Sequence, residues 1–266
     1  MITSLTNPKI KRLVQLKNKG KLRREEKVFL VEGSRMFQEL PEEAVLELYV
    51  TEHFLDGSKD SEVERKLQKF RNLCETVSEE VFARISDTVT PQGILAVVRQ
   101  MEYTLEDVLK KDRPLLLVTE DIQDPGNLGT MFRTAEAAGV DGIIMSRDTV
   151  DIYNPKTVRA TMGAIFRMPF LYADSLTEVM DILKKRDITV YAAALHHSVS
   201  YTEADYCKGS AVLIGNEGNG LRQETVELAS QAVSIPMQGK VESLNASISA
   251  AVILYEATRQ RSIAEA

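Results

Sequence analysis

The stretch AVLIGNEGNGL, residues 211–221, and the stretch VSIPMQGKVESLNASISAA, residues 233–251, decide the fold of this chain. Each begins as a short apolar strand, passes into a loop rich in glycine and polar residues, and continues into a helix. Small residues at such junctions let the backbone approach a ligand closely. Because the two junctions follow one another so closely, they predict two walls of one small-molecule pocket.

The strands that precede these junctions continue a series that starts at residue 115. Helical stretches separate the strands, and this alternation predicts an α/β domain over residues 115–266, with a mainly parallel sheet covered on both faces. The expected strands lie at 115–122, 142–145, 168–172, 189–195, 211–215 and 232–236. Ligands of such sheets bind beyond the carboxyl ends of the strands, where both glycine-rich loops lie.

A smaller unit precedes this domain. Residues 1–100 alternate helix and strand signals, and they predict a compact α/β/α unit. Its strands are expected at 28–33, 46–51, 73–77 and 93–99. The segment 101–114 is charged, ends in proline and lacks a strong apolar face, so we expect it to be the linker.

The composition is that of a soluble globular protein. Of 266 residues, 44% are hydrophobic and 27% are charged, and no segment approaches the roughly 20 apolar residues that span a bilayer. The N-terminus lacks the apolar stretch of a signal peptide, so we expect a cytoplasmic protein without a membrane partner. Cys74, Cys207 and the histidines are not spaced as zinc ligands, and we expect neither a disulfide nor a metal.

The basic residues are concentrated at the N-terminus. A net charge of −6 argues against a protein held on nucleic acid by its overall field, but residues 1–24 carry eight basic side chains and no acid. Such a block suits phosphate contacts, although a solvated helix face would have the same pattern, and charge alone does not distinguish RNA from DNA. The candidate contacts are Lys9, Lys11, Arg12, Lys17, Lys19, Lys21, Arg23 and Arg24.

A third polar segment, DPGNLGTMFRTAEAAG at 124–139, follows the first strand of the larger domain. Asn127 and Gly129 are expected in the turn, with Arg133 about one turn into the helix and pointing back towards the loop. Its forked, permanently charged head suits a phosphate. The alternative is a helix-start arginine paired with Asp124 or Glu136.

The glycine spacing excludes common nucleotide sites. Residues 215–220 read GxxGxG, not the GxGxxG of dinucleotide sites, and they lie late in the domain; a Walker phosphate loop is absent. A nicotinamide-dependent oxidoreductase or an ATP enzyme is therefore disfavoured. In the last segment, Pro236 ends the strand, Gly239 permits a tight turn, and Ser243 or Asn245 could cap the following helix.

In this order, the three segments resemble the SpoU (TrmH) branch of the SPOUT methyltransferases, and most of all the bacterial 23S rRNA methyltransferases. The first family motif is matched by Asn127, Gly129 and Arg133, the second by Gly215, Asn216, Glu217, Gly218 and Gly220, and the third by Ile235, Pro236, Met237, Gly239, Ser243, Leu244 and Asn245. The match covers roughly residues 115–261. Residues 1–100 resemble, more weakly, the L30e-like domain that binds RNA substrate in this family.

The resemblance implies a deep trefoil knot, a homodimer packed through the knot domain, and methylation of RNA ribose 2′-hydroxyls, in which S-adenosylmethionine becomes S-adenosylhomocysteine. The implied catalytic residues are Arg133, Asn127, Ser243, Asn245 and Glu217. The implied cofactor-binding residues are Leu195, Gly215, Asn216, Glu217, Gly218, Ile235, Met237, Leu244 and Asn245. A protonated arginine is a poor base, so an electrostatic role for Arg133 is easier to defend than proton removal.

Two alternatives keep the same fold. One is a non-catalytic RNA-binding protein with a degenerate methyltransferase domain, against which the intact Asn127, Arg133 and Asn245 argue. The other is an enzyme that methylates tRNA instead of ribosomal RNA. The sequence alone does not choose between these two substrates.

Overall fold

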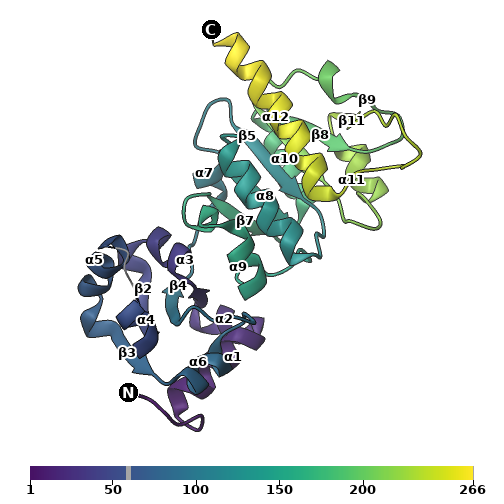
Figure 1. Cartoon of the computed structure of the whole chain (residues 1–266). Helices are drawn as coiled ribbons and strands as arrows, with labels where there is room; N and C mark the ends of the chain where they lie inside the picture. Colours follow the sequence, from purple (N-terminus) through teal and green to yellow (C-terminus); the bar gives the residue numbers. More distant parts are fainter. Residues whose placement is uncertain (58–60, 266) are drawn as a thin grey trace. The chain divides into compact units, whose positions relative to one another are not determined.

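The computed structural model describes residues 1–57 and 61–265, which form two compact units (Figure 1). The first unit comprises Met1–Met101 and Asp151–Phe166, and the second comprises Glu102–Val150 and Arg167–Ala266. In the part of the chain that the structure describes, no helix is both long and apolar enough to cross a membrane.

The second unit is built on a parallel sheet, as the alternation of strands and helices predicts. Its strands are β5 (Leu115–Thr119), β6 (Gly142–Ser146), β7 (Phe170–Ala173), β8 (Thr189–Ala193), β9 (Val199–Ser200), β10 (Ser210–Ile214) and β11 (Gln231–Ser234). They lie in the order β7-β6-β5-β10-β8-β11-β9, and the pairings are parallel. The two-residue strand β9 is too short to give a periodic signal and is the one that the sequence does not predict.

Helices cover both faces of this sheet. They are α7 (Leu105–Val108), α8 (Pro125–Ala137), α10 (Leu176–Lys185), α11 (Gln223–Leu228) and α12 (Ala246–Ala264). Helices α8 and α12 lie side by side, and α12 also contacts β10 (Figure 1). On the other face, Val179 and Leu183 of α10 pack with Leu116 and Val118 of β5 in one buried core. Burial on both faces explains why the sequences of β5, β6 and β10, whose residues are all buried, are mostly apolar.

The expected linker at 101–114 belongs to the second unit from Glu102 onward. A capping box between Thr104 and Asp107 starts the short helix α7, which buries Val108 and, just beyond it, Leu109. Val108 packs so closely on β6 that a Cβ at Gly142 would lie 2.5 Å from its Cγ1. Two well-placed apolar residues therefore anchor a segment that lacks a continuous apolar face.

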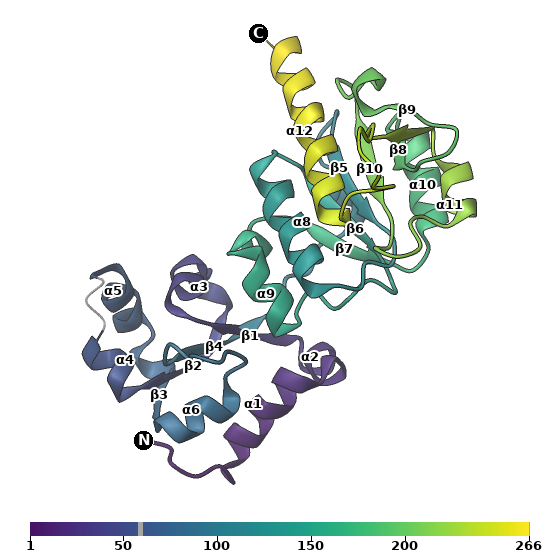
Figure 2. The same cartoon turned by 45° about the vertical axis from the view of Figure 1, so that its right-hand side comes forward.

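The first unit contains a four-stranded mixed sheet in the order β1-β4-β2-β3. Its strands are β1 (Val28–Glu32), β2 (Val45–Thr51), β3 (Cys74–Val77) and β4 (Ile94–Arg99), and its N-terminal helices are α1 (Pro8–Asn18), α2 (Gly20–Glu26), α3 (Ser34–Glu39), α4 (Glu52–Gly57), α5 (Ser61–Lys69) and α6 (Glu79–Ile85). Helices α1 and α6 pack on one face through Ile10, Leu13, Leu16 and Phe82 (Figure 2). All four strands lie where the sequence predicts them.

Residues 151–166, which we expected in the larger domain, pack in the first unit instead. Helix α9 (Pro155–Thr161) contacts β1, and the ring of Tyr153 lies 4.7 Å from that of Phe29. The chain therefore passes between the two units three times, after Met101, after Val150 and after Phe166. The packing of residues 151–166 in the first unit depends on contacts between distant segments, which a local sequence pattern does not predict.

The basic N-terminal block is partly internal. Arg23 is 3% exposed, pairs with Asp151 with 2.6 Å between Nη2 and Oδ2, and donates to the carbonyls of Leu16 and Lys17. It is therefore not available as the RNA contact that we expected, because its charge is already satisfied inside the fold. Arg12 pairs with Glu26 and Glu47.

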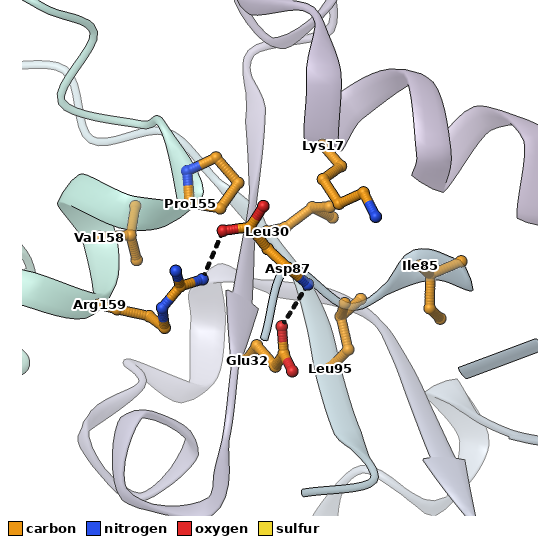
Figure 3. A pocket seen from close by; sticks show the side chains of 9 residues that line it. All are labelled: Lys17, Leu30, Glu32, Ile85, Asp87, Leu95, Pro155, Val158 and Arg159. Carbon is orange, nitrogen blue, oxygen red and sulfur yellow. Dashed lines mark hydrogen bonds and ion pairs between the residues drawn. The ribbon is translucent and has the colours of Figure 1, made fainter. Parts of the chain in front are cut away.

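Lys17 is also used within the first unit. Its ammonium donates to the carbonyls of Arg84, in the last turn of α6, and of Ser86, its C-cap, and so satisfies carbonyls that the helix leaves free. Together with Glu32, Asp87 and Arg159 it lines a cavity of about 10 Å³, the space of one water molecule (Figure 3). Lys9 pairs with Glu75. The exposed members of the block are Lys11, Lys19, Lys21 and Arg24, besides the half-exposed Lys9.

Candidate active site

The polar segments singled out from the sequence meet at the carboxyl edge of the parallel sheet. Strands β5, β10, β8 and β11 are neighbours in that order, so the loops that follow them emerge next to one another. The loop at 120–124 follows β5 and leads into α8, and the loop at 215–221 follows β10. Strand β11 leads into the loop at 235–245, which ends at α12.

Helix α8 begins earlier than the sequence analysis predicts. Asp124 is its N-cap and accepts the backbone N–H of Asn127 over 2.8 Å, and Pro125 takes the first helical position. Asn127 and Gly129 therefore lie in the helix, not in a turn before it. Arg133 consequently lies about two turns into the helix, further from its start than we expected.

Asn127 joins the three segments through hydrogen bonds. Its Nδ2 donates to Oε1 of Glu217 over 3.0 Å, and its Oδ1 accepts from Nδ2 of Asn245 over 2.9 Å. Both functions of one amide are thus used, one towards the loop after β10 and one towards the start of α12. Three segments that are far apart in the sequence form one polar cluster.

Glu217 is held by the loop that precedes α8. Its carboxylate accepts the backbone N–H groups of Gln123 over 3.1 Å and Asp124 over 3.0 Å, in addition to the amide of Asn127. Partial burial by itself raises the pKa of Glu217, but these donors outweigh it and hold the pKa below the ordinary value of 4.5. The side chain is therefore a fixed carboxylate at neutral pH.

Glycine and asparagine shape the loop at 215–221. The backbone around Gly215 is so crowded that a Cβ there would lie 2.3 Å from the carbonyl carbon of Gly220 and 2.3 Å from the nitrogen of Leu221. Asn216 and Gly220 exchange two backbone hydrogen bonds, and the Oδ1 of Asn216 accepts the N–H groups of Gly218 and Asn219. The conformation thus requires glycine at 215.

Of the two candidate caps for α12, Asn245 is the one that caps it. Its Oδ1 accepts the N–H groups of Ser247 over 2.9 Å and of Ile248 over 3.3 Å. Ser243 lies exposed in the preceding loop. Asn245 thus fixes the helix start and, through its other amide atom, the orientation of Asn127.

Arg133 is paired with neither Asp124 nor Glu136. Glu136 pairs with Arg167 instead, and Asp124 is used as the cap of α8. Arg133 is exposed, and among the residues that the structure describes it makes no hydrogen bond or ion pair. A permanently charged guanidinium without a partner is available for an anionic ligand.

The expected cofactor residues include apolar side chains next to the ends of neighbouring strands. Leu195 and Ile235 lie two residues beyond Ala193 and Val233, which are paired in register between β8 and β11. Leu195 is 57% exposed and Leu244 is 36% exposed, whereas Ile235 and Met237 are partly buried. Exposed apolar groups at the ligand-binding edge of a parallel sheet can contact the flat face of a purine.

The sequence analysis misses several polar residues that support the cluster. Ser247 is buried and donates to Oδ1 of Asn245 over 2.7 Å. Glu120, Asp121 and Arg222 connect the loops after β5 and β10. Ser247 could have been found as the residue two positions after a helix cap. The contacts of Arg222 with Glu120 and Asp121 give no local signal, because those two residues lie about a hundred positions away.

The fold and this cluster define an α/β protein with its ligand site at the carboxyl edge of a parallel sheet. Residues 114–255 match the SpoU rRNA Methylase family, and residues 7–96 match the MRM3-like substrate binding domain. The chain belongs to the SpoU rRNA methylase family.

Relatives match nearly the whole chain. This chain is 34% identical over 257 residues to the 23S rRNA (guanosine(2553)-2′-O)-methyltransferase RlmP of Bacillus subtilis strain 168. The alignment covers 96% of this chain and 97% of the relative. The SpoU methyltransferase AviRb from Streptomyces viridochromogenes, solved in complex with AdoMet, aligns with a TM-score of 0.86 and 28% identity over 97% of this chain and 100% of that one. The AdoMet-bound rRNA methyltransferase from Sinorhizobium meliloti aligns with a TM-score of 0.82 and 32% identity over 97% of each chain.

Proposed function

We propose that this protein transfers a methyl group from S-adenosylmethionine to a ribose 2′-hydroxyl of 23S ribosomal RNA. The observation that carries the proposal is the convergence of Asn127, Glu217 and Asn245, one from each of the three polar segments, at the edge of the sheet where ligands bind. Family membership and the names of relatives that match nearly the whole chain support the reaction and the class of RNA. We also propose that the protein is cytoplasmic.

The residues at the carboxyl ends of β10, β8 and β11 suit S-adenosylmethionine. Leu195, Ile235, Met237 and Leu244 offer apolar contacts for the adenine ring, and the crowded backbone at Gly215 offers N–H and C=O groups without an intervening side chain. With Asn216, Glu217, Gly218 and Asn245, they are the residues that we propose hold the cofactor. When bound, S-adenosylmethionine supplies an electrophilic methyl group.

Arg133 is the residue that we propose binds the acceptor. Its guanidinium is exposed and has no partner among the described residues, so it can pair with an RNA phosphate and stabilise negative charge that develops on the 2′-oxygen. Because arginine stays protonated, it acts electrostatically. Asn127 orients the site, and Ser243 completes it from the loop before α12.

Replacement of Arg133 tests the function. R133A should abolish methyl transfer to 23S rRNA transcribed in vitro while leaving the calorimetric Kd for S-adenosylmethionine unchanged; R133K should recover only a small part, because lysine lacks the fork that grips a phosphate. Near-normal turnover by R133A would contradict the assignment. Absence of S-adenosylmethionine binding to the unmodified protein would instead favour a non-catalytic RNA-binding protein.

The choice of RNA is tested separately. Ribose methylation should be missing from one 23S rRNA position in cells that lack the gene and should return when it is restored. A methylation lost from a tRNA, with ribosomal RNA unaffected, would replace the proposed substrate by tRNA.

We also propose that two copies associate through α12. Three apolar side chains on this helix, Ile248, Tyr255 and Ile263, are 48%, 52% and 64% exposed, and their spacing of about two turns places them on one side. Sedimentation should show a dimer at micromolar concentration, and Y255E should dissociate it. A monomer at that concentration would contradict this part.

The trefoil knot implied by the resemblance is proposed as well. The small buried residues Ala246, Ser247 and Ala250 permit another segment to pass close to the start of α12. Pulling the chain by its two ends should leave it shorter than a fully extended chain by the length that a tightened knot retains.

A further inference from the structure

A second polar cluster joins the loops after β5 and β10, and its centre is Asp121. The backbone of Asp121 has φ of 55°, in the left-handed region that residues with a Cβ adopt only at a cost in free energy. Such a conformation persists where its surroundings impose it. The contacts of Asp121 therefore identify the groups that hold its backbone in this conformation.

The side chain of Asp121 is held from two sides. Ser146, the last residue of β6, donates its hydroxyl to Oδ1 over 2.7 Å and accepts the backbone N–H of Asp121 over 2.8 Å. From the other side, Nη2 of Arg222 donates to Oδ2 over 2.9 Å. One carboxylate thus links the end of β6 to the end of the loop that follows β10.

The carbonyl of Asp121 holds the start of the same loop. Nδ2 of Asn216 donates to this oxygen over 2.8 Å. Asp121 therefore contacts the glycine-rich loop at both ends, at Asn216 through its backbone and at Arg222 through its side chain. Glu217, which contacts Asn127, lies between these two attachment points.

Glu120 reinforces the second attachment. Glu120 is 1% exposed, and its carboxylate accepts the backbone N–H of Arg222 over 2.8 Å and the hydroxyl of Thr225 over 2.6 Å. The Nε of Arg222 lies 3.4 Å from the same carboxylate. Nη1 of Arg222 also lies 3.6 Å from Glu224, two residues further along the chain. The half-exposed arginine is thus held by two acidic residues of one short loop, Glu120 and Asp121, and by one residue of its own segment.

We propose that Asp121 and Arg222 are positioning residues for methyl transfer: their ion pair fixes the loop at 215–221 against the loop at 120–124, and thereby places Glu217 on Asn127. This inference rests on the proposed function for the reaction it affects. Neither side chain belongs to the three matched motifs. A small displacement of site residues is enough to slow a reaction about a hundredfold.

The test uses D121N, R222A, R222K and the double variant D121N/R222A in the full chain. D121N keeps a residue that tolerates left-handed backbone and can still bond with Ser146, but it removes the charge that faces Arg222. With labelled S-adenosylmethionine and 23S rRNA transcribed in vitro, D121N and R222A should each lower kcat by about ten- to a hundredfold, with little change in KM for RNA. The double variant should be no slower than the slower single variant, because the pair acts as a unit.

R186A is the matched control. Nη2 of Arg186 donates to both carboxylate oxygens of Glu106 in the same unit, at 2.7 and 2.8 Å, but beside the amino ends of the strands. It should keep normal kcat. R222K retains the charge but cannot bridge two carboxylates in the same way, so its kcat should lie between those of R222A and the unmodified protein. This variant also serves if R222A fails to fold.

Hydrogen exchange separates this inference from the proposed function. Backbone amides of the loop at 215–221 should exchange faster in D121N and R222A than in the unmodified protein, whether or not the right RNA has been supplied. Unchanged exchange, normal kcat in both single variants, or multiplied losses in the double variant would overturn the positioning role. If the variants exchange faster but the unmodified protein transfers no methyl group, the attachment of the loop is supported and the proposed reaction is rejected.

Discussion

The side-chain amide of Asn245 donates to that of Asn127, with 2.9 Å between Nδ2 and Oδ1. This contact leaves Nδ2 of Asn127 to donate to Glu217, so the orientation of the central amide is fixed from both sides. A residue of the same shape with a different hydrogen-bonding capacity would therefore disturb the site without disturbing its packing.

N127D makes this change. It keeps the acceptor for Asn245 but places a carboxylate against Glu217 where a donor was, and like charges at hydrogen-bonding distance repel. We expect methyl transfer to fall by about a hundredfold, measured with labelled S-adenosylmethionine under single-turnover conditions. N72D, which alters an exposed amide in the short turn Arg71–Leu73 of the first unit, is the control. Equal rates for both variants would argue against a central role for Asn127.

Glu217 predicts a dependence of stability on acid. Its pKa in the folded protein lies below 4.5 because donors from Asn127 and the backbone outweigh partial burial, so its contribution is present above pH 4.5 and is lost as the pH falls through the lower folded value. Tm should therefore differ between the unmodified protein and E217Q by a constant amount at neutral pH. The difference should shrink on acidification below pH 4.5. A difference that does not change with pH would contradict this.

Asp151 should be essential for the stability of the first unit. Its partner Arg23 has a side chain that is 4% exposed, and D151A would leave that charge buried without an acid. We expect a loss of about 3 kcal/mol or more in the unfolding free energy of that unit, measured with urea. E25A removes an ion pair with Lys21 on the same helix, where both side chains are well exposed, and should change stability little. Similar urea midpoints for the two variants would refute the structural role of Arg23.

The RNA contacts of the first unit are best tested on Lys11, Lys19, Lys21 and Arg24, which are exposed. Replacing all four by alanine should weaken RNA binding and lower the slope of log Kd against log salt by about 3, the release expected for four phosphate contacts. K184A/K185A, with two exposed lysines of α10 changed, should keep the slope. Unchanged affinity and slope in the fourfold variant would remove the basic block from the RNA-binding surface.

Deleting the whole block would not give this information. Residues 1–24 also include Ile10, Leu13 and Leu16, which are fully buried in the core of the first unit. Loss of RNA binding after such a deletion would report unfolding, not lost phosphate contacts.

Apolar patterning predicts most of this fold because buried parallel strands must be apolar throughout. The strands that carry the site lie where such runs occur, and the polar segments after them meet as expected, with Asn127, Glu217 and Asn245 in contact. The predicted start of α8 is wrong, because Asp124 is the N-cap and Pro125 the first helical residue, a recognisable pair at a helix start.

Other features follow from contacts that no local pattern contains. Arg23 looks like a surface residue until Asp151, from the middle of the chain, is placed beside it. The same holds for the contacts of Arg222 with Glu120 and Asp121, which lie on another loop. Charge pairs between distant segments depend on the tertiary fold, so composition and spacing alone could not assign either arginine.

The discontinuous first unit has a consequence during synthesis on the ribosome. A domain made of consecutive residues can fold as soon as it leaves the exit tunnel. Here Arg23 and β1 are synthesised long before their partners Asp151 and α9. The first unit is therefore complete only after Phe166 has emerged. By then β5, α8 and β6 of the second unit are already outside. The nascent chain must therefore hold parts of two incomplete cores at once, and the order of their completion is set by translation.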